Sequence, residues 1–388
     1  MIRPIYLYGM PGSLYTAKVR AYLRKRRIPF IERAPAHDAF RARILPTVGR
    51  WIIPVIELAD GTIVQDGADI LAHFERQAPF AIPASPVMEV LARVLELFGS
   101  EGLLRPAMHY RWNFDAENLD FLRNDFLSGL APKADDEAGQ AIFATASTRM
   151  RAAAVIFGVG PDHFEAIETA YGEFLALFEA HLRDVPYVLG GQPSLGDFGL
   201  LGPLYAHLGR DPVPARLMQR AAPRVWRWAE RMNAPPDEGE SEYLDHPDAL
   251  FSPQALPESL LALLRYVARE YLPEITAHVD FTNTWLEAQG QDITGSNGLK
   301  RPHERVLGMT AFPWRGRQLH IAIMPYRLYL LQHIQDAAAR AGPEERARIE
   351  GILVATGLSP LLTLKTHRRV ERVNSLEVWG PDLRACTT

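Results

Sequence analysis

The stretch from Tyr6 to Arg20, YLYGMPGSLYTAKVR, places the strongest constraint on the fold of this 388-residue chain. It predicts a short apolar strand, a loop broken by Pro11 and Gly12, and a helix that runs to about Arg27. The loop brings Ser13 to the helix start, where unpaired backbone N–H groups and the helix dipole attract an anion. A hydroxyl at this place suits a thiolate or carboxylate ligand, although serine is also an ordinary helix cap.

A second informative stretch is the apolar run from Trp51 to Leu58, which contains Pro54. Because proline cannot donate a ladder hydrogen bond, it needs an edge, a strand start, a bulge or a cis bond. Asp60-Gly61 then predicts a hairpin, and Gln65-Asp66-Gly67 opens another helix.

These segments together resemble the glutathione transferase superfamily. Residues 13–20 are similar to its serine-type active-site segment, which in plant members commonly reads S-P-F-x-x-R-V-R. Ile53-Pro54 resembles its cis-proline dipeptide, so we predict that this bond is cis. Residues 66–70 resemble its E/D-S-x-x-I segment. The sequence departs from this pattern at Leu14, where proline is usual, and at Gly67, where serine is usual.

The resemblance implies an α/β plus all-α architecture in three parts. A thioredoxin-like glutathione-binding domain is expected over residues 1–79, and a helical glutathione-transferase C-terminal domain over residues 86–233. Ser194 and Asp197 form a capping-box pattern that is typical of the family's helical domain, where its role is in folding. Apolar residues at helical spacing predict helices over 88–98, 101–112, 165–182, 195–208 and 222–232.

Residues 234–388 form an extension that an ordinary member of the family lacks. After a polar linker at 234–240, the patterns predict helices over 257–272 and 326–340, a loop over 312–317 and a terminal strand at 376–379. The segment 321–331 is too apolar to remain solvated, so we expect a mostly helical, ordered body packed on the helical domain.

The role of this extension is left open by the sequence. It can shape the substrate pocket, complete a dimer or bind a partner. Tyr326 and Arg327, beside the break at Pro325, are expected near the mouth of the cleft, and the alternative is ordinary packing at a helix start.

Composition narrows the classes of function. A net charge of −4 and a pI of about 6.3 argue against a nucleic-acid surface. Cys386 is the single cysteine, so neither a disulfide nor a cysteine metal site is expected, and no metal is predicted. Without a signal-like start or a long apolar run, we expect a cytoplasmic protein with no membrane contact. The six basic residues between Lys18 and Arg27 are expected to form a solvated helix face.

The resemblance implies glutathione as co-substrate and assigns roles to the first domain. A free thiol has a pKa near 8.5 and is mostly protonated at about pH 7, whereas the nucleophile is the thiolate. Ser13 would donate a hydrogen bond to the sulfur, with Tyr8 as the rival donor.

The other residues of this domain would hold the peptide part of glutathione. The backbone of Ile53, beside Pro54, would pair with it like an added strand. Gln65 and Asp66 would bind the γ-glutamyl end, with Asp66 on its ammonium group and the Gly67 amide on its carboxylate. The missing serine hydroxyl at position 67 should cost about 1 kcal/mol.

Candidates for the second-substrate pocket are Tyr15 and the run His109-Tyr110-Arg111-Trp112. The rings can cover an apolar substrate, and Arg111 can hold a carboxylate through paired donors. The alternative is that this run is an interdomain packing cluster.

Serine in place of cysteine argues against glutaredoxin-like thiol exchange, which requires a protein thiolate. The expected activity is therefore attack of the glutathione thiol on a small hydrophobic electrophile, by a homodimer. The competing interpretation is a binding or interaction protein that kept the transferase fold without catalysis, which Gly67 and the long extension favour.

Overall fold

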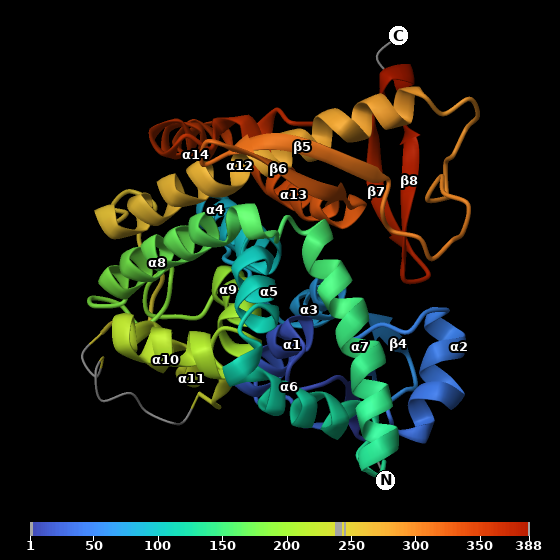
Figure 1. Ribbon diagram of the computed structural model, residues 1–388. Helices are drawn as coiled ribbons and strands as arrows, with labels where there is room; N and C mark the ends of the chain where they lie inside the picture. Colours follow the sequence, from blue (N-terminus) through green and yellow to red (C-terminus); the bar gives the residue numbers. More distant parts are fainter. Residues whose placement is uncertain (1–2, 237–242, 244–245, 387–388) are drawn as a thin grey trace.

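The computed structural model describes residues 3–236, 243 and 246–386. Figure 1 shows an α/β domain, a helical domain and a mostly helical extension that lies across both, with the two chain ends on opposite sides. The predicted fold class is thereby confirmed. The predicted linker at 234–240 lies mostly outside the described residues.

The N-terminal domain is built on a four-stranded sheet with the strand order β2-β1-β3-β4. β1 runs parallel to β2 and antiparallel to β3, and β3 and β4 form the hairpin predicted at Asp60-Gly61. The Ile53-Pro54 bond is cis, as predicted. The elements are β1 (Ile5–Tyr8), α1 (Leu14–Lys25), β2 (Phe30–Arg33), a π-helix (Phe40–Ile44), α2 (Leu45–Val48), β3 (Val55–Glu57), β4 (Ile63–Gln65) and α3 (Gly67–Gln77).

The helical domain is organised around α9 (Leu195–Ala206), which is buried along nearly its whole length between α1 and α4. Its predicted capping box is present. The Asp197 carboxylate accepts hydrogen bonds from the backbone N–H and from the hydroxyl of Ser194. The other helices are α4 (Pro86–Leu97), α5 (Leu104–Trp112), α6 (Asp115–Leu130), α7 (Asp136–Ile156), α8 (Phe164–His181), α10 (Pro212–Ala221) and α11 (Pro223–Asn233), with a π-helix at Phe98–Gly102 and a 3₁₀ turn at Pro161–His163.

Close packing of α9 depends on glycine. A Cβ atom at Gly99 would lie 2.4 Å from the backbone nitrogen of Leu200, and one at Gly199 would lie 2.5 Å from the Cα of Glu96. Both distances are too short for any side chain, so the two backbones can approach only because these positions carry none.

The extension combines helices with two β-hairpins. α13 packs on α4, and α12 packs on α8. The elements are α12 (Glu258–Glu287), β5 (Gly308–Trp314), β6 (Arg317–Ile323), α13 (Pro325–Ala339), α14 (Pro343–Thr356), β7 (Arg368–Val373) and β8 (Leu376–Asp382), with 3₁₀ turns at Ser359–Leu362 and Leu383–Cys386.

Two sequence-based expectations for the extension are wrong. Residues 312–317 do not form a loop. They include the end of β5 and the start of β6, joined by a tight turn at Arg315 and Gly316, which both have left-handed backbone conformations. The helix expected to end at Leu272 continues through Pro273 to Glu287. Burial of Tyr271 and Ile275 on either side of the proline stabilises the helix despite the lost hydrogen bond.

The solvated face expected for the basic residues of α1 is also wrong. Lys18, Arg20 and Lys25 are buried. Lys18 forms an ion pair with Glu96 of α4, and Arg20 donates two 2.7 Å hydrogen bonds to Glu32 of β2. Lys18 and Arg20 therefore hold α1 to its neighbours, because each meets a buried or half-buried acidic partner.

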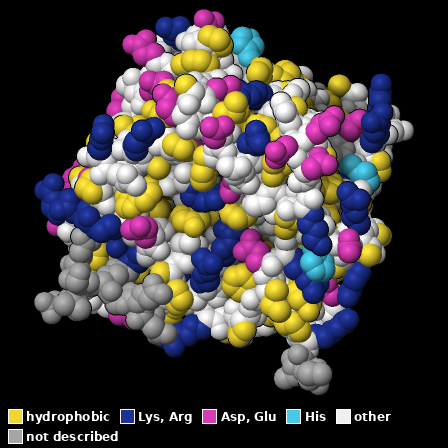
Figure 2. All heavy atoms as spheres, turned by 60° about the horizontal axis from the view of Figure 1, so that its bottom comes forward, with side chains coloured by type: hydrophobic (Ala, Val, Ile, Leu, Met, Phe, Trp, Pro, Cys, Tyr) yellow, Lys and Arg dark blue, Asp and Glu magenta, His cyan; other side chains and the backbone are white. Residues whose placement is uncertain are grey.

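The surface seen from the bottom of Figure 1 carries both signs of charge. Figure 2 shows Lys and Arg side chains spread over this face with acidic and apolar side chains among them. In the described part of the chain, no single helix is long and apolar enough to cross a membrane, although α7 and residues 161–181 pass that test together as a pair bent by 56°.

Candidate functional site

Ser13 stands at the N-terminus of α1, as the sequence predicts. Its Oγ accepts a 3.2 Å hydrogen bond from the Thr16 N–H, and the side chain is half-buried. The loop before it is held from the helical domain, since Arg111 Nη1 donates to the carbonyl oxygen of Gly12 at 3.1 Å and His207 Nε2 lies 3.1 Å from the same oxygen. The position of Ser13 is thus fixed from both domains.

The start of α3 lies beside this helix start. A Cβ atom at Gly67 would contact Lys18 Cδ at 3.5 Å and the Tyr15 carbonyl oxygen at 3.8 Å. The Asp66 N–H donates to the Pro54 carbonyl oxygen at 3.3 Å. The start of α1, the turn before β3 and the start of α3 therefore meet, which brings three of the predicted glutathione-binding segments together.

Asp66 has an unusual backbone conformation, with φ of 92° and ψ of 142°. A non-glycine residue rarely adopts a positive φ, so the surrounding structure must hold it there. Its Oδ1 accepts a 2.8 Å hydrogen bond from the Ala68 N–H and thereby caps α3. Gln65, directly before it, is also buried.

The rival donor Tyr8 lies inside the N-terminal domain. It is fully buried, its hydroxyl donates to Glu57 Oε2 at 3.1 Å, and it accepts from Arg33 Nη1 at 3.2 Å. Burial raises the pKa of Tyr8. This hydroxyl already has two partners, so the geometry favours Ser13, and both assignments stay predictions.

The run from His109 to Trp112 is buried on α5. Nε2 of His109 lies 2.9 Å from Glu168, the Tyr110 ring stacks on Phe114 with centroids 5.4 Å apart, and Arg111 donates to both carboxylate oxygens of Asp211 at 2.8 and 2.7 Å. These contacts agree with the packing alternative, and the pocket role of the run stays a prediction.

The extension reaches the predicted glutathione-binding residues, which the sequence did not indicate. The Tyr326 hydroxyl donates to Asp66 Oδ1 at 2.9 Å, and Arg372 Nη2 donates to Gln65 Oε1 at 2.8 Å. Asp69 of α3 accepts hydrogen bonds of 2.8 Å from the Tyr329 hydroxyl and 2.6 Å from Arg372 Nε. These contacts join α13 and β7 to the start of α3.

Tyr326 and Arg327, expected near the cleft mouth, are 5% and 1% exposed. Tyr326 does contact a predicted site residue, whereas Arg327 turns inward. Arg327 Nε donates to Glu101 at 3.1 Å, and its Nη1 pairs with Glu274. Tyr15 joins the same network, because its hydroxyl donates to Glu101 at 3.3 Å.

Three arginines surround Glu377 of β8 at the edge of this site. Arg372 and Arg305 donate to its Oε1 at 2.7 and 3.1 Å, and Arg50 lies 3.5 Å from Oε2. Burial alone would raise the pKa of Glu377, but Arg305, Arg372 and Arg50 hold it below its ordinary value. Arg50 also donates to the Ser375 carbonyl oxygen at 2.8 Å, which fastens the β7–β8 turn to the N-terminal domain.

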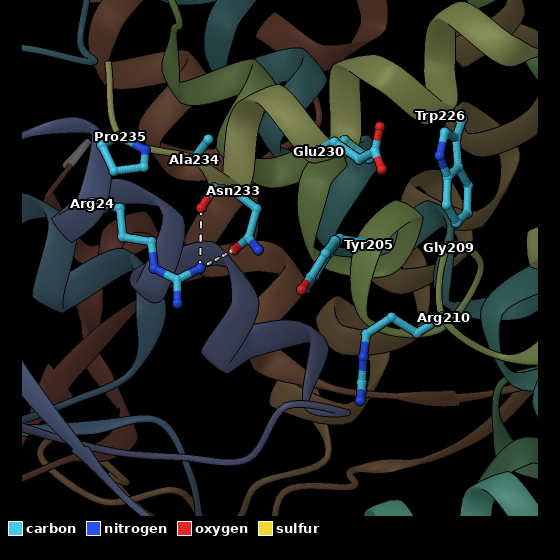
Figure 3. A pocket seen from close by; sticks show the side chains of 10 residues that line it. Arg24, Tyr205, Gly209, Arg210, Trp226, Glu230, Asn233, Ala234 and Pro235 are labelled. Atoms are coloured by element: carbon cyan, nitrogen blue, oxygen red, sulfur yellow. Dashed lines mark hydrogen bonds between the residues drawn. The ribbon is translucent and has the colours of Figure 1, made fainter. Parts of the chain in front are cut away.

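A cavity of about 510 Å³ lies elsewhere, between the end of α1, the end of α9 and α11. Figure 3 shows Arg24 and Tyr205 with their polar ends toward the same space, and Arg24 Nη1 donates to the Asn233 carbonyl and side-chain oxygens at 3.0 and 2.9 Å. This cavity contains none of the predicted site residues. Among the described residues, no group of three or more His, Cys, Asp or Glu side chains is placed to hold a metal ion.

Comparison with protein families agrees with this architecture. Residues 7–90 match the family model of the glutathione S-transferase N-terminal domain, and residues 161–231 match that of the glutathione S-transferase C-terminal domain. Over these two regions the chain matches the two domains of the glutathione S-transferase family, as the sequence resemblance indicated. The extension, residues 234–388, lies beyond both matched regions.

The solved structures that the chain matches include several glutathione S-transferases. One from Xanthobacter autotrophicus is 24% identical, with 61% of this chain and 95% of that chain covered and a TM-score of 0.35. The β-etherase from Sphingobium is 20% identical, with 61% and 96% covered and a TM-score of 0.43. A glutathione S-transferase of Ceriporiopsis subvermispora, in complex with glutathione, is 18% identical, with 64% and 100% covered and a TM-score of 0.40. No curated protein matches the chain.

Proposed function

We propose that this protein is a glutathione transferase-like enzyme that activates the thiol of glutathione for attack on a small apolar electrophile. The observation that carries the proposal is the meeting of two helix starts: Ser13 caps α1, and Gly67, the first residue of α3, lies against Tyr15 and Lys18 in the first turns of α1. Helix starts offer N–H donors and a favourable potential to an anion. The two family matches support glutathione as that ligand.

Ser13 acts as a hydrogen-bond donor to the sulfur and not as a covalent nucleophile. A hydroxyl has one donor and two acceptor sites, and the Thr16 N–H takes one of the acceptor sites. The O–H is therefore available for a thiolate. Lowering the thiol pKa by about two units corresponds to roughly 2.7 kcal/mol of preferential thiolate stabilisation.

The peptide part of glutathione binds along the segment that contains Ile53, with the γ-glutamyl end at the start of α3. Asp66 Oδ1 already accepts two hydrogen bonds, from the Ala68 N–H and the Tyr326 hydroxyl. The ammonium group is therefore proposed to bind the other oxygen, Oδ2. The Gly67 N–H, at the first helical position, faces the carboxylate.

A second candidate function is a transferase-fold binding or interaction protein without turnover. The contacts of Tyr326 with Asp66 and of Arg372 with Gln65 favour it, because residues proposed to bind glutathione have partners within the chain. A homodimer and a cytoplasmic location remain part of the main proposal.

Calorimetric titration with glutathione, followed by turnover assays on a panel of aromatic, alkyl and carbonyl electrophiles, separates these candidates. The enzyme proposal expects saturable binding and glutathione-dependent turnover of at least one electrophile. Weak or absent glutathione binding, with no turnover over the panel, would favour the second candidate and exclude the enzyme proposal.

A further inference from the structure

The extension adds a positive charge with spare hydrogen-bond donors to the proposed glutathione site. Of the three arginines around Glu377, Arg372 also bonds to Asp69 and Gln65, and Arg50 also bonds to the Ser375 carbonyl. Arg305 differs, since its one hydrogen bond within the described residues is the 3.1 Å contact of Nη2 with Glu377. Its side chain is 27% exposed, against 5% for Arg372 and 9% for Arg50.

Arg305 is linked through Tyr326 to Asp66, the residue proposed to bind the γ-glutamyl ammonium group. Its guanidinium is 5.7 Å from the centroid of the Tyr326 ring, and the hydroxyl of that ring donates to Asp66. Burial alone would lower the pKa of Arg305, but Glu377, Tyr15, Asp66 and Glu101 together raise it. Arg305 is therefore within electrostatic reach of both the start of α1 and the start of α3.

Gly67 gives the proposed glutathione site one hydrogen-bond donor fewer than the family serine would. The family serine at this position would offer a hydroxyl to the ligand, and glycine offers only its N–H. A carboxylate desolvated at a helix start with one donor fewer is bound more weakly. The Arg305 guanidinium has two donor nitrogens without a partner among the described residues, and its fork matches a carboxylate, so it can supply donors that glycine lacks.

Resting on the proposed function, we propose that Arg305 determines ligand specificity by binding the α-carboxylate of the γ-glutamyl group, in place of the hydroxyl that Gly67 lacks. The charges support this assignment. Arg50, Arg305 and Arg372 face Asp66, Asp69 and Glu377, and these six charges sum to zero. A γ-glutamyl head carries one ammonium and one carboxylate, so it binds Asp66 and Arg305 without leaving a charge unpaired.

The test compares two ligands in three variants of the full-length protein. The ligands are glutathione and 4-aminobutyryl-cysteinylglycine, which keeps the amine and thiol but lacks the α-carboxylate. The variants are Arg305→Met, Arg305→Lys and the control Arg301→Met, which alters an 82% exposed side chain of the same loop. Arg372 and Arg50 continue to neutralise Glu377 in Arg305→Met, and thermal unfolding checks that this variant is folded.

Calorimetry should show at least a tenfold loss of glutathione affinity in Arg305→Met, about 1.4 kcal/mol. The same variant should bind the analogue within twofold of the unaltered protein, Arg305→Lys should lose less than Arg305→Met, and Arg301→Met should change neither affinity. Unchanged or tighter glutathione binding in Arg305→Met would overturn the inference, as would an equal loss for both ligands. Absence of glutathione binding by the unaltered protein would instead overturn the proposed function and, with it, this assignment.

Discussion

The hydroxyl of Tyr326 donates a 2.9 Å hydrogen bond to Oδ1 of Asp66, across 260 residues of sequence. This bond joins the first turn of α13 to the residue that caps α3. The extension therefore contacts the proposed glutathione site directly and does not form a separate unit. Any ligand that binds at the start of α3 meets side chains from the first and the last parts of the chain together.

Replacing Ser13 with alanine should lower glutathione-dependent turnover by tenfold or more, at least about 1.4 kcal/mol of barrier. Steady-state kinetics provides the measurement. Because Ser13 also caps α1, the variant should lose about 1 kcal/mol of stability. Asp135→Ala removes a comparable cap from α7 and should leave turnover unchanged. Full activity in Ser13→Ala, with loss in Tyr8→Phe, would transfer the donor role to Tyr8.

Restoring the family serine with Gly67→Ser should tighten glutathione binding by about fivefold, or about 1 kcal/mol. The site has room, since the nearest atoms to a new Cβ are at ordinary contact distances of 3.5 and 3.8 Å. Titration calorimetry measures the change. Gly172→Ser, on an exposed turn of α8 with no atom within 4 Å of the new Cβ, is the matched control. Weaker binding in Gly67→Ser would mean that the ligand does not use this helix start.

Stability should fall as the pH is lowered from 7 to 5, partly because of His278. Burial, and secondarily Arg327, lower the pKa of His278 to about 3, so the folded protein keeps it neutral. The unfolded chain takes up a proton near pH 6.5, and this linkage removes stability as the pH falls below that value. For His278 alone the loss is about 2 kcal/mol between pH 7 and pH 5.

Urea unfolding at both pH values measures this effect. The drop in stability should be smaller by about that amount in His278→Gln, which cannot titrate, than in the unaltered protein. Exposed His320→Gln should keep the full drop. Equal pH dependence in all three proteins would show that His278 does not stay neutral in the folded state.

Arg327→Met should destabilise the protein by about 3–5 kcal/mol, because it leaves buried carboxylates without their main cation. Arg327 donates to Glu101 and also pairs with Glu274, and all three side chains are buried. Thermal unfolding followed by circular dichroism is the measurement. Arg346→Met, which breaks the surface pair with Glu350, should change stability by less than about 1 kcal/mol. A similarly small loss of stability in both variants would show that the contacts of Arg327 with Glu101 and Glu274 contribute little to holding the extension in place.

Several features could be predicted because their causes are local. The position of Ser13 at the start of α1, the hairpin at Asp60-Gly61 and the capping box of Ser194 and Asp197 each depend on residues a few positions apart. The cis bond before Pro54 was predicted from the proline within an apolar run together with the family pattern.

Other predictions failed where a distant partner decides the outcome. The basic residues of α1 look like a solvated face until Glu96 and Glu32 are brought against Lys18 and Arg20. The helix that contains Pro273 was predicted to end at Leu272, because proline usually ends a helix. That expectation does not take into account the burial of residues on the neighbouring turns.

The sequence by itself thus determined the two-domain order, the helix starts and the residue types available for thiol chemistry. Only the tertiary structure decided which of those residues meet. Asp66, Tyr326 and Arg305 are brought together by packing of α13 on α4 and by the β7–β8 hairpin against the N-terminal domain. No local pattern encodes such a contact, because its geometry is set by how buried surfaces hundreds of residues apart fit together.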